Sequence, residues 1–513
     1  MIDDGDTPAM TTPVAAPDPR HLAHDWLRPL RVAFDLADPT PIVAAAAAGL
    51  REALTRLGNT VDPAPRPETE VVIANAGFGQ PISWRRAPLF VAGRRYRMAR
   101  TPTVVTLISA TAREVDVILE RLAESLALEA PGADDFPYPG VAPRAYQVFV
   151  EQGRRGGPIL ALTRLLQAQS KCLRIILLVG EGAPERAYHF DLVGAHPMTV
   201  ATDPAAFYED MALRVATAAG VKPVVEHEQV PPPVSRAEWE RLATPGQMCR
   251  ASTELNARGF FTAMLRVADL VAVPMLGDAV ASQYSEGCFA TWDVDLGALI
   301  ATVTGSARPV NKGQLTPEEL AVIVGVRPEA TGALVRAVEG QASTPPSSEA
   351  VEMMGVDAVL PWHTLGEGWP TPAQRSAATR VPAADRVPAA RSKLHGHRGI
   401  SAYHPGYVEF LPLDAPYYYY PVSCGSDAQA RGITTAFSRS AALADPDDPR
   451  QVVFTVLPGH GVVIAEKWVA GKAPLETIWE YMDAGYLVVE RLIPQGVLTY
   501  EPGQDGRHHL REP

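Results

Sequence analysis

Three histidines in the second half of the chain have the type and spacing of a metal site. His395 and His397 stand one residue apart in "SKLHGHRG", and His460 lies between two glycines in "LPGHGVVIAE". Side chains two positions apart on a strand point to the same face, so an extended segment brings the first two together. Neutral imidazoles bind zinc readily, and a catalytic zinc keeps three protein ligands and an open position. We therefore predict that these three histidines bind Zn²⁺ or another divalent metal.

A carboxylate and two hydroxyls precede an expected helix in "TPPSSEAVEMM". Glu349 lies at the helix start, where the helix dipole favours a carboxylate, and it is placed for proton transfer. Ser347 and Ser348 offer hydroxyls and backbone N–H groups that suit an anionic end of a substrate. We predict Glu349 as the catalytic acid or base and the two serines as substrate-binding residues.

Each of these patterns also has a plainer interpretation. Two of the histidines would lie in an exposed turn and the third in a glycine turn, and the serines would simply cap a helix. His363 in "PWHTLGEGW" is a rival ligand that lacks a partner histidine. The tyrosine run at 416–422 is either an aromatic substrate wall or a strand that packs on the core.

Bulk composition narrows the class of protein. The 513 residues are 47% hydrophobic and 20% charged, with a formal net charge of −12, which argues against nucleic acid or an anionic membrane surface as the main partner. Four cysteines far apart form no disulfide framework, and no run has the length of a membrane span. We therefore expect a cytoplasmic protein.

Strands that alternate with helices predict an α/β fold in the first half, with a mainly parallel sheet. "LRVAFDLAD", "TEVVIANAG", "TPTVVTLISA" and "LRIILLVGEG" have strand patterns, and "PIVAAAAAGLREALTRLG" an Ala-rich helix pattern closed by Gly58. The basic glycine turn at 153–157 lacks the spacing of a phosphate loop. His189, His196 and Asp191 have no further ligands nearby in sequence and are interpreted as surface or strand-end residues.

Proline-rich and polar stretches mark the predicted domain boundaries. The proline triplet in "EHEQVPPPVSRAEW" favours an extended linker. The predicted divisions are a disordered tail at 1–24, an α/β domain at 25–228, a linker at 229–244, a second domain at 245–500 and a tail at 501–513. A Pro/Ala-rich insertion at 363–391 lies within the second domain. After His460, "PLETIWEYMDAGYLVVERL" has the pattern of a long helix.

The order of motifs in the second half resembles the class II aldolase/adducin family. A strand ends in the turn Thr304-Gly305, then follow "LTPEEL", "PSSE", the His395/His397 pair and His460-Gly461. The resemblance covers roughly residues 250–495. It implies a three-layer α/β/α domain in which Thr304 and Gly305 help to bind the substrate. It also implies aldol cleavage, or related epimerase or decarboxylase chemistry, of a small sugar-like hydroxy-carbonyl compound.

The chain departs from the family pattern before the Thr-Gly turn. The family's phosphate-binding "GNxS" turn is replaced by "SEGCFATWD", which puts a phosphorylated substrate in doubt. Two other functions stay open. One is a non-catalytic, adducin-like interaction protein, and the other is a metal-dependent sugar isomerase resembling fucose isomerase, with Glu286 and Asp293 as ligands. The resemblance further implies a homo-tetramer with its site near a subunit boundary.

Overall fold

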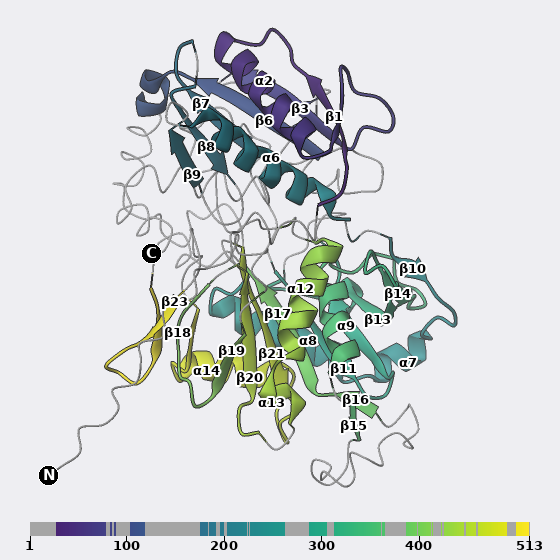
Figure 1. Ribbon diagram of the computed structural model, residues 1–513. Helices are drawn as coiled ribbons and strands as arrows, with labels where there is room; N and C mark the ends of the chain where they lie inside the picture. The colour runs from purple at the N-terminus through teal and green to yellow at the C-terminus, as the bar shows by residue number, and fades with distance from the viewer. Residues whose placement is uncertain are drawn as a thin grey trace, which may run out of the picture.

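The computed structural model has two α/β parts, one above the other in Figure 1. The structure describes residues 27–77, 103–117, 175–182, 184–190, 195–199, 203–222, 226–261, 287–304, 312–360, 362–364, 386–397, 399–411, 425–445, 448–457, 460–489 and 499–511, with the short pieces 83–84, 87–88, 224, 413 and 422. The N-terminal tail, the turn at 153–157, Gly305, Glu286, Asp191 and the tyrosine run except Val422 lie outside the described residues.

The first part is built on a seven-stranded sheet with the order β2-β1-β3-β6-β7-β8-β9. The first five strands in this order are parallel, and β8 and β9 add an antiparallel edge. The strands are β1 (Arg31–Asp35), β2 (Thr60–Asp62), β3 (Val71–Gly77), β6 (Thr103–Ala110), β7 (Ile175–Val179), β8 (Arg186–Phe190) and β9 (Ala195–Thr199). The expected α/β class and mainly parallel sheet are therefore present.

Among the described residues, two helices pack on this sheet. α2 (Pro41–Arg56) and α6 (Pro204–Gly220) lie side by side in Figure 1, and their apolar faces share one core with β1, β3, β6 and β7. α2 ends as expected, because Gly58 takes the left-handed conformation with φ +84°. A small hairpin joins β4 (Ser83–Trp84) to β5 (Ala87–Pro88).

The second part is built on a nine-stranded sheet with the order β10-β14-β13-β12-β11-β17-β21-β20-β19. Neighbouring strands in this sheet are antiparallel, except for the pairs at its two edges, β10 with β14 and β19 with β20, which are parallel. The strands are β10 (Glu228–Gln229), β11 (Cys288–Asp293), β12 (Ala298–Thr302), β13 (Leu320–Val326), β14 (Ala333–Arg336), β17 (Ala390–Gly396), β19 (Val408–Leu411), β20 (Val452–Leu457) and β21 (Gly461–Lys467).

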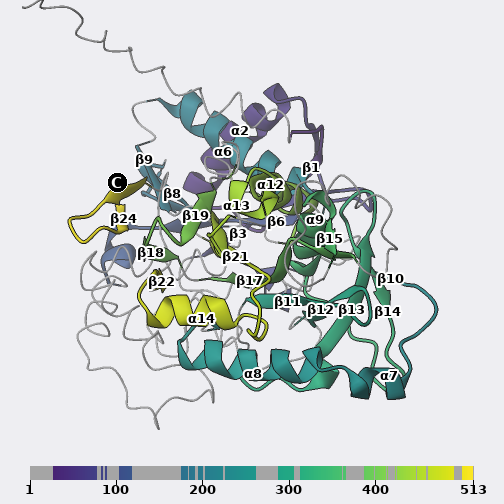
Figure 2. The ribbon, with the colours of Figure 1, turned by 90° about the horizontal axis from the view of Figure 1, so that it is seen from below.

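Helices cover both faces of this sheet, which gives three layers in the view of Figure 2. α9 (Ala350–Val359), α12 (Asp427–Ser438) and the short α13 (Ala441–Ala444) lie on one face. α8 (Thr244–Ala257) and α14 (Glu476–Asp483) lie on the other, and α7 (Arg236–Arg241) lies near the edge formed by β10 and β14. The short 3-10 helix η6 (Pro317–Glu319), in the "LTPEEL" segment, begins with a capping box, because Thr316 and Glu319 bond reciprocally.

Smaller sheets complete the second part. β15 (Trp362–Thr364) pairs with β16 (Arg386–Pro388). A four-stranded sheet has the order β22-β18-β24-β23, with β18 (Ile400–Tyr403), β22 (Leu487–Val489), β23 (Thr499–Pro502) and β24 (His508–Arg511). Residues 501–513, expected as a tail, thus contribute β24, because the turn residues of "EPGQDG" connect two short strands.

Two other expectations differ from the structure. The long helix expected in "PLETIWEYMDAGYLVVERL" ends at Asp483, because Gly485 takes φ +70° and the β-branched "YLVV" continues as β22. The predicted linker at 229–244 carries the end of β10 and the whole of α7. A bridge from Val234 to Val338 holds it against the sheet.

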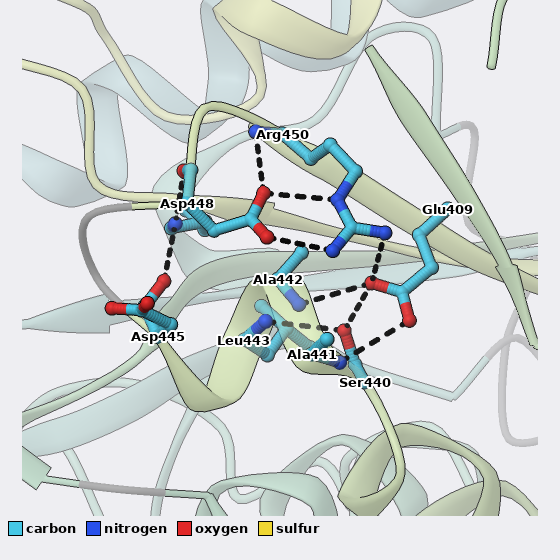
Figure 3. A network of polar contacts seen from close by, with 9 residues as sticks. Glu409, Ser440, Ala441, Ala442, Leu443, Asp445, Asp448 and Arg450 are labelled. Atoms are coloured by element: carbon cyan, nitrogen blue, oxygen red, sulfur yellow. Dashed lines mark hydrogen bonds and ion pairs between the residues drawn. The ribbon is translucent and has the colours of Figure 1, made fainter. Parts of the chain in front are cut away.

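A polar network ties α13 to the edge of the large sheet, as Figure 3 shows. The Glu409 carboxylate on β19 accepts hydrogen bonds from Ser440 Oγ at 2.8 Å and from the backbone N–H of Ala442 at 3.0 Å. Arg450 contacts this carboxylate at 3.5 Å and Asp448 at 2.6 Å. The network satisfies the open N–H groups of α13, so we interpret it as structural.

Candidate metal centre

The pairing of β17 with β21 brings the three histidines together. The two strands are antiparallel, with His395 opposite Val463 and Gly396 opposite Val462. The end of one strand therefore meets the start of the other. His397 directly follows β17, and His460 directly precedes β21. All three side chains are buried.

Glycines allow the two backbones to approach at this point. A Cβ atom on Gly461, which has φ +150°, would lie 1.9 Å from the carbonyl oxygen of Gly396. A Cβ atom on Gly396 would lie 2.3 Å from the ring of Phe260. The glycine beside each histidine is thus required by close backbone and ring contact.

The ring nitrogens converge on one point. One ligand atom from each histidine lies within 4.8 Å of those of the other two, and Nε2 of His460 lies 3.3 Å from Nε2 of His397. Two nitrogens bound to a tetrahedral zinc at its usual bond length lie about 3.3 Å apart. The pair thus already has the spacing of two ligands of one ion.

His395 is held in the form that a metal requires. Its Nδ1 lies 3.1 Å from the carbonyl oxygen of Val462, so this nitrogen carries the proton and donates it. Its Nε2 is buried and has no hydrogen-bond partner among the described residues. Burial lowers the pKa of His395 to about 3, and the neighbouring His397 adds to the effect, so the ring is neutral. A neutral imidazole with a buried open lone pair fits a divalent metal.

Glu349 lies beside this cluster at the start of α9. The Ser347 hydroxyl donates a hydrogen bond of 2.5 Å to its Oε2. Burial acts to raise the pKa of the Glu349 carboxyl. The net pKa is nevertheless well below the usual range, because His395, the Ser347 hydroxyl and the Lys312 ammonium favour the carboxylate. Glu349 is therefore a buried, ionised carboxylate next to the histidines.

Of the predicted substrate-binding residues that the structure describes, Ser347 contacts this carboxylate. Ser347 is buried and bonds to Glu349, while Ser348 is half-buried. The backbone N–H of Thr304 donates to Pro345 at 2.9 Å, and the N–H of Ser347 donates to Thr302 at 2.9 Å. Residues 302–304 and the "PSSE" segment are thus adjacent through backbone hydrogen bonds.

The rival metal ligands that the structure describes lie in other parts of the fold than the three histidines. Asp293 ends β11 at the opposite end from Cys288, the residue paired with His395, and its carboxylate accepts the N–H of Leu296 at 2.8 Å. His363 lies on β15, in a separate two-stranded sheet. His189 on β8 is paired in register with His196 on β9, in the first part of the molecule.

Three residues near Glu349 did not stand out in the sequence. Cys288 lies directly opposite His395 on β11, and burial together with the Glu349 charge raises the pKa of its thiol well above the usual value. Lys312 is 5% exposed, and its ammonium lowers the pKa values of Glu349, Cys288 and His395. Glu352 is buried one turn after Glu349, and neither carboxyl oxygen has a hydrogen-bond partner among the described residues. The sequence contained a signal for Glu352, because an acidic residue is unusual in the apolar helix "AVEMMGVDAV". It contained no signal for Cys288, whose position depends on strand pairing.

Known proteins offer no match that bears on this site. No family model, curated protein sequence or solved structure matches the chain. Across the described parts of the chain, no helix combines the length and apolar character needed to cross a membrane.

Proposed function

We propose that the chain is a metal-dependent lyase that cleaves a carbon–carbon bond in a small hydroxy-carbonyl compound by aldolase-type chemistry. The observation that carries the proposal is the buried cluster of His395, His397 and His460 with the ionised Glu349 beside it. The ordered motifs that resemble the class II aldolase/adducin family, and the three layers around a largely antiparallel sheet, support the same assignment.

The residues divide the chemistry between them. A zinc ion held by the three imidazoles supplies a Lewis acid for the substrate carbonyl and for the negative charge that develops on its oxygens. Glu349 takes the proton of the substrate hydroxyl as the neighbouring carbon–carbon bond breaks, and it returns a proton to the carbon that leaves that bond. Ser347 acts as a positioning residue, because its hydroxyl fixes the orientation of the Glu349 carboxylate.

A non-catalytic interaction protein is less well supported. An interaction protein does not require a buried carboxylate beside three buried imidazoles, and burying these polar groups is energetically unfavourable. The homo-tetramer stays a prediction of the resemblance, and a light-scattering mass of one chain would contradict it.

The test has two stages. Elemental analysis of protein purified without added metal is expected to find about one divalent ion per chain, as three protein ligands require. The zinc-loaded protein is then incubated with a panel of hydroxy-ketones and hydroxy-acids, and aldehyde release is measured. Absence of bound metal after zinc loading would overturn the proposal.

A further inference from the structure

A buried ion pair joins the helix that begins at Glu349 to the strand that carries His395. The Lys393 ammonium on β17 contacts the Asp357 carboxylate on α9, and both side chains are fully buried. Lys393 precedes His395 by two residues, so both side chains leave β17 on the same face, about 7 Å apart along the strand. Asp357 follows Glu349 by about two helical turns, or about 12 Å along α9. The pair is thus a direct contact between the two elements that position Glu349 and His395.

Stability does not account for this pair. A buried ion pair offsets the loss of hydration only when its remaining polar atoms are also hydrogen-bonded. The second carboxylate oxygen, Oδ2 of Asp357, is buried without a hydrogen-bond partner among the described residues, and the Lys393 ammonium has no other hydrogen bond to them. Well-packed apolar side chains of similar volume are often as stable as such a pair, or more stable.

The apolar contacts of α9 do not by themselves fix its position along the sheet. Its buried apolar residues are Ala350, Val351, Met353, Met354 and Val356. Contacts of this kind are non-directional, and methionine side chains adapt to small displacements. The segment just before α9 is fixed by the N–H of Ser347, which donates to the carbonyl of Thr302 at 2.9 Å. The ion pair is a second directional contact, near the other end of the helix.

Resting on the metal site of the function proposed above, we propose that Lys393 and Asp357 are positioning residues, which fix α9 on β17 and so hold His395 and Glu349 in place for metal binding and proton transfer. A single directional polar contact in an apolar interface can select one register among several that pack equally well. The pair acts through His395, since any displacement of β17 against α9 at Lys393 reaches that ligand within two residues. Removal of both charges should therefore preserve the fold and weaken the metal site.

The experiment compares metal binding and stability in the full chain. Zinc affinity is measured by competition with a chromophoric chelator, the coordination geometry by visible absorption of the Co²⁺-substituted protein, and stability by the urea midpoint. Lys393→Met/Asp357→Leu is expected to unfold near the wild-type midpoint, to bind zinc about 10- to 100-fold more weakly and to show altered cobalt bands, as expected when a group that orients a ligand is lost. Val356→Ala is the matched control. It leaves a cavity beside Asp357 in α9 and should lower the midpoint, but it keeps the pair and should bind zinc as the wild type does.

The possible outcomes separate this inference from the proposed function. A double variant with wild-type zinc affinity and cobalt bands would overturn the positioning role and leave the metal site intact. An equal loss of affinity in Val356→Ala would overturn it too, because metal binding would then follow stability alone. If the double variant does not fold, Lys393→Met/Asp357→Asn, whose amide has the shape of the carboxylate, takes its place with the same expectations. Wild-type protein that does not bind zinc would instead overturn the proposed function, and this inference with it.

Discussion

Nε2 of His397 lies 3.3 Å from Nε2 of His460, although 63 residues separate the two histidines in the chain. Two imidazole nitrogens at this distance are held either by one shared proton or by one shared cation. The orientation of His395, whose Nδ1 faces the carbonyl of Val462, adds a third nitrogen with an open lone pair and favours the cation.

Replacement of His395 by alanine tests this interpretation directly. The variant is expected to lower zinc affinity by more than about 100-fold, since loss of a partner that merely orients a ligand already costs 10- to 100-fold. Metal content after dialysis against a weak chelator gives the measurement. His509→Ala is the matched control, because His509 is 46% exposed and bonds to Asp505. Equal metal content in both variants would show that no such site exists.

Glu349→Gln separates proton transfer from metal binding. The amide keeps the size of the side chain and can still accept the Ser347 hydroxyl, so fold and zinc content should not change. Turnover is expected to fall by about 10²- to 10⁴-fold, the usual contribution of a general acid or base. Steady-state kinetics with a compound active in the aldehyde assay gives the comparison. Full activity would place the acid or base elsewhere.

The sequence was informative about the candidate metal site because its parts are short and local. An HxH pair, a glycine after His460 and a carboxylate at a helix start are each visible within a few residues. The pairing of β17 with β21 then brings the three histidines together. Cys288 was interpreted as a structural residue, because its position opposite His395 depends on the register of β11 with β17, which has no local pattern in the sequence.

The prediction of one long helix after His460 was wrong at the end of α14, because it relied on the periodicity of apolar residues. "WEYMDAGYLVVERL" has enough apolar residues for a long amphipathic helix, but Gly485 breaks the helix and Leu487–Val489 pair with β18. Tertiary pairing decided the conformation of a segment whose local pattern was ambiguous. The α/β class of the first half, in contrast, followed from several strand patterns that alternate with helix patterns, and that of the second half from the order of its motifs.

Gly461→Ala should destabilise the fold because a Cβ atom there would meet the Gly396 carbonyl oxygen at 1.9 Å. The backbone must shift, and we expect a loss of more than about 2 kcal/mol in the free energy of unfolding, with weaker zinc binding. Gly246→Ala in α8 is the control, since a Cβ atom there has no neighbour within 4 Å. Urea denaturation of both variants checks this. A Gly461→Ala protein as stable as the control would mean that the two strands do not approach as described.

The ion pair of Lys393 with Asp357 joins β17 to α9, two residues before His395 in the chain, with both side chains fully buried. Lys393→Met alone leaves Asp357 buried without its cation, and we expect a loss of about 3–5 kcal/mol. The double variant Lys393→Met/Asp357→Leu should lose much less, because no charge remains buried. Chemical denaturation of the single and double variants measures the difference. The exposed pair Glu52–Arg56 is the control, and its removal should change stability by less than about 1 kcal/mol. A double variant as unstable as the single one would show that packing, not charge, dominates at this position.

Glu466 gives a pH dependence whose sign follows from its burial. Its carboxyl accepts the backbone N–H of Leu475 at the start of α14 and lies near Arg391, Ser392 and the N–H of Ile478. Burial raises its pKa from 4.5 to about 7, although these contacts partly oppose the effect. The folded state therefore holds this proton more tightly than the unfolded chain does. The resulting stability is fully present below pH 4.5 and is lost as the pH rises through about 7.

Glu466→Gln removes this titration and keeps an oxygen that can accept the Leu475 N–H. The stability of the variant relative to the wild type should therefore increase between pH 4.5 and pH 7.5, by at most on the order of 3 kcal/mol, because each pKa unit corresponds to 1.36 kcal/mol. Urea denaturation of both proteins across this range gives the difference at each pH. Contributions of other titrating groups, such as Asp357, whose pKa burial raises to about 6, cancel in that difference. A difference that stays constant with pH would show that Glu466 is already ionised in the folded protein at low pH, held by Arg391 and the N–H groups at the start of α14.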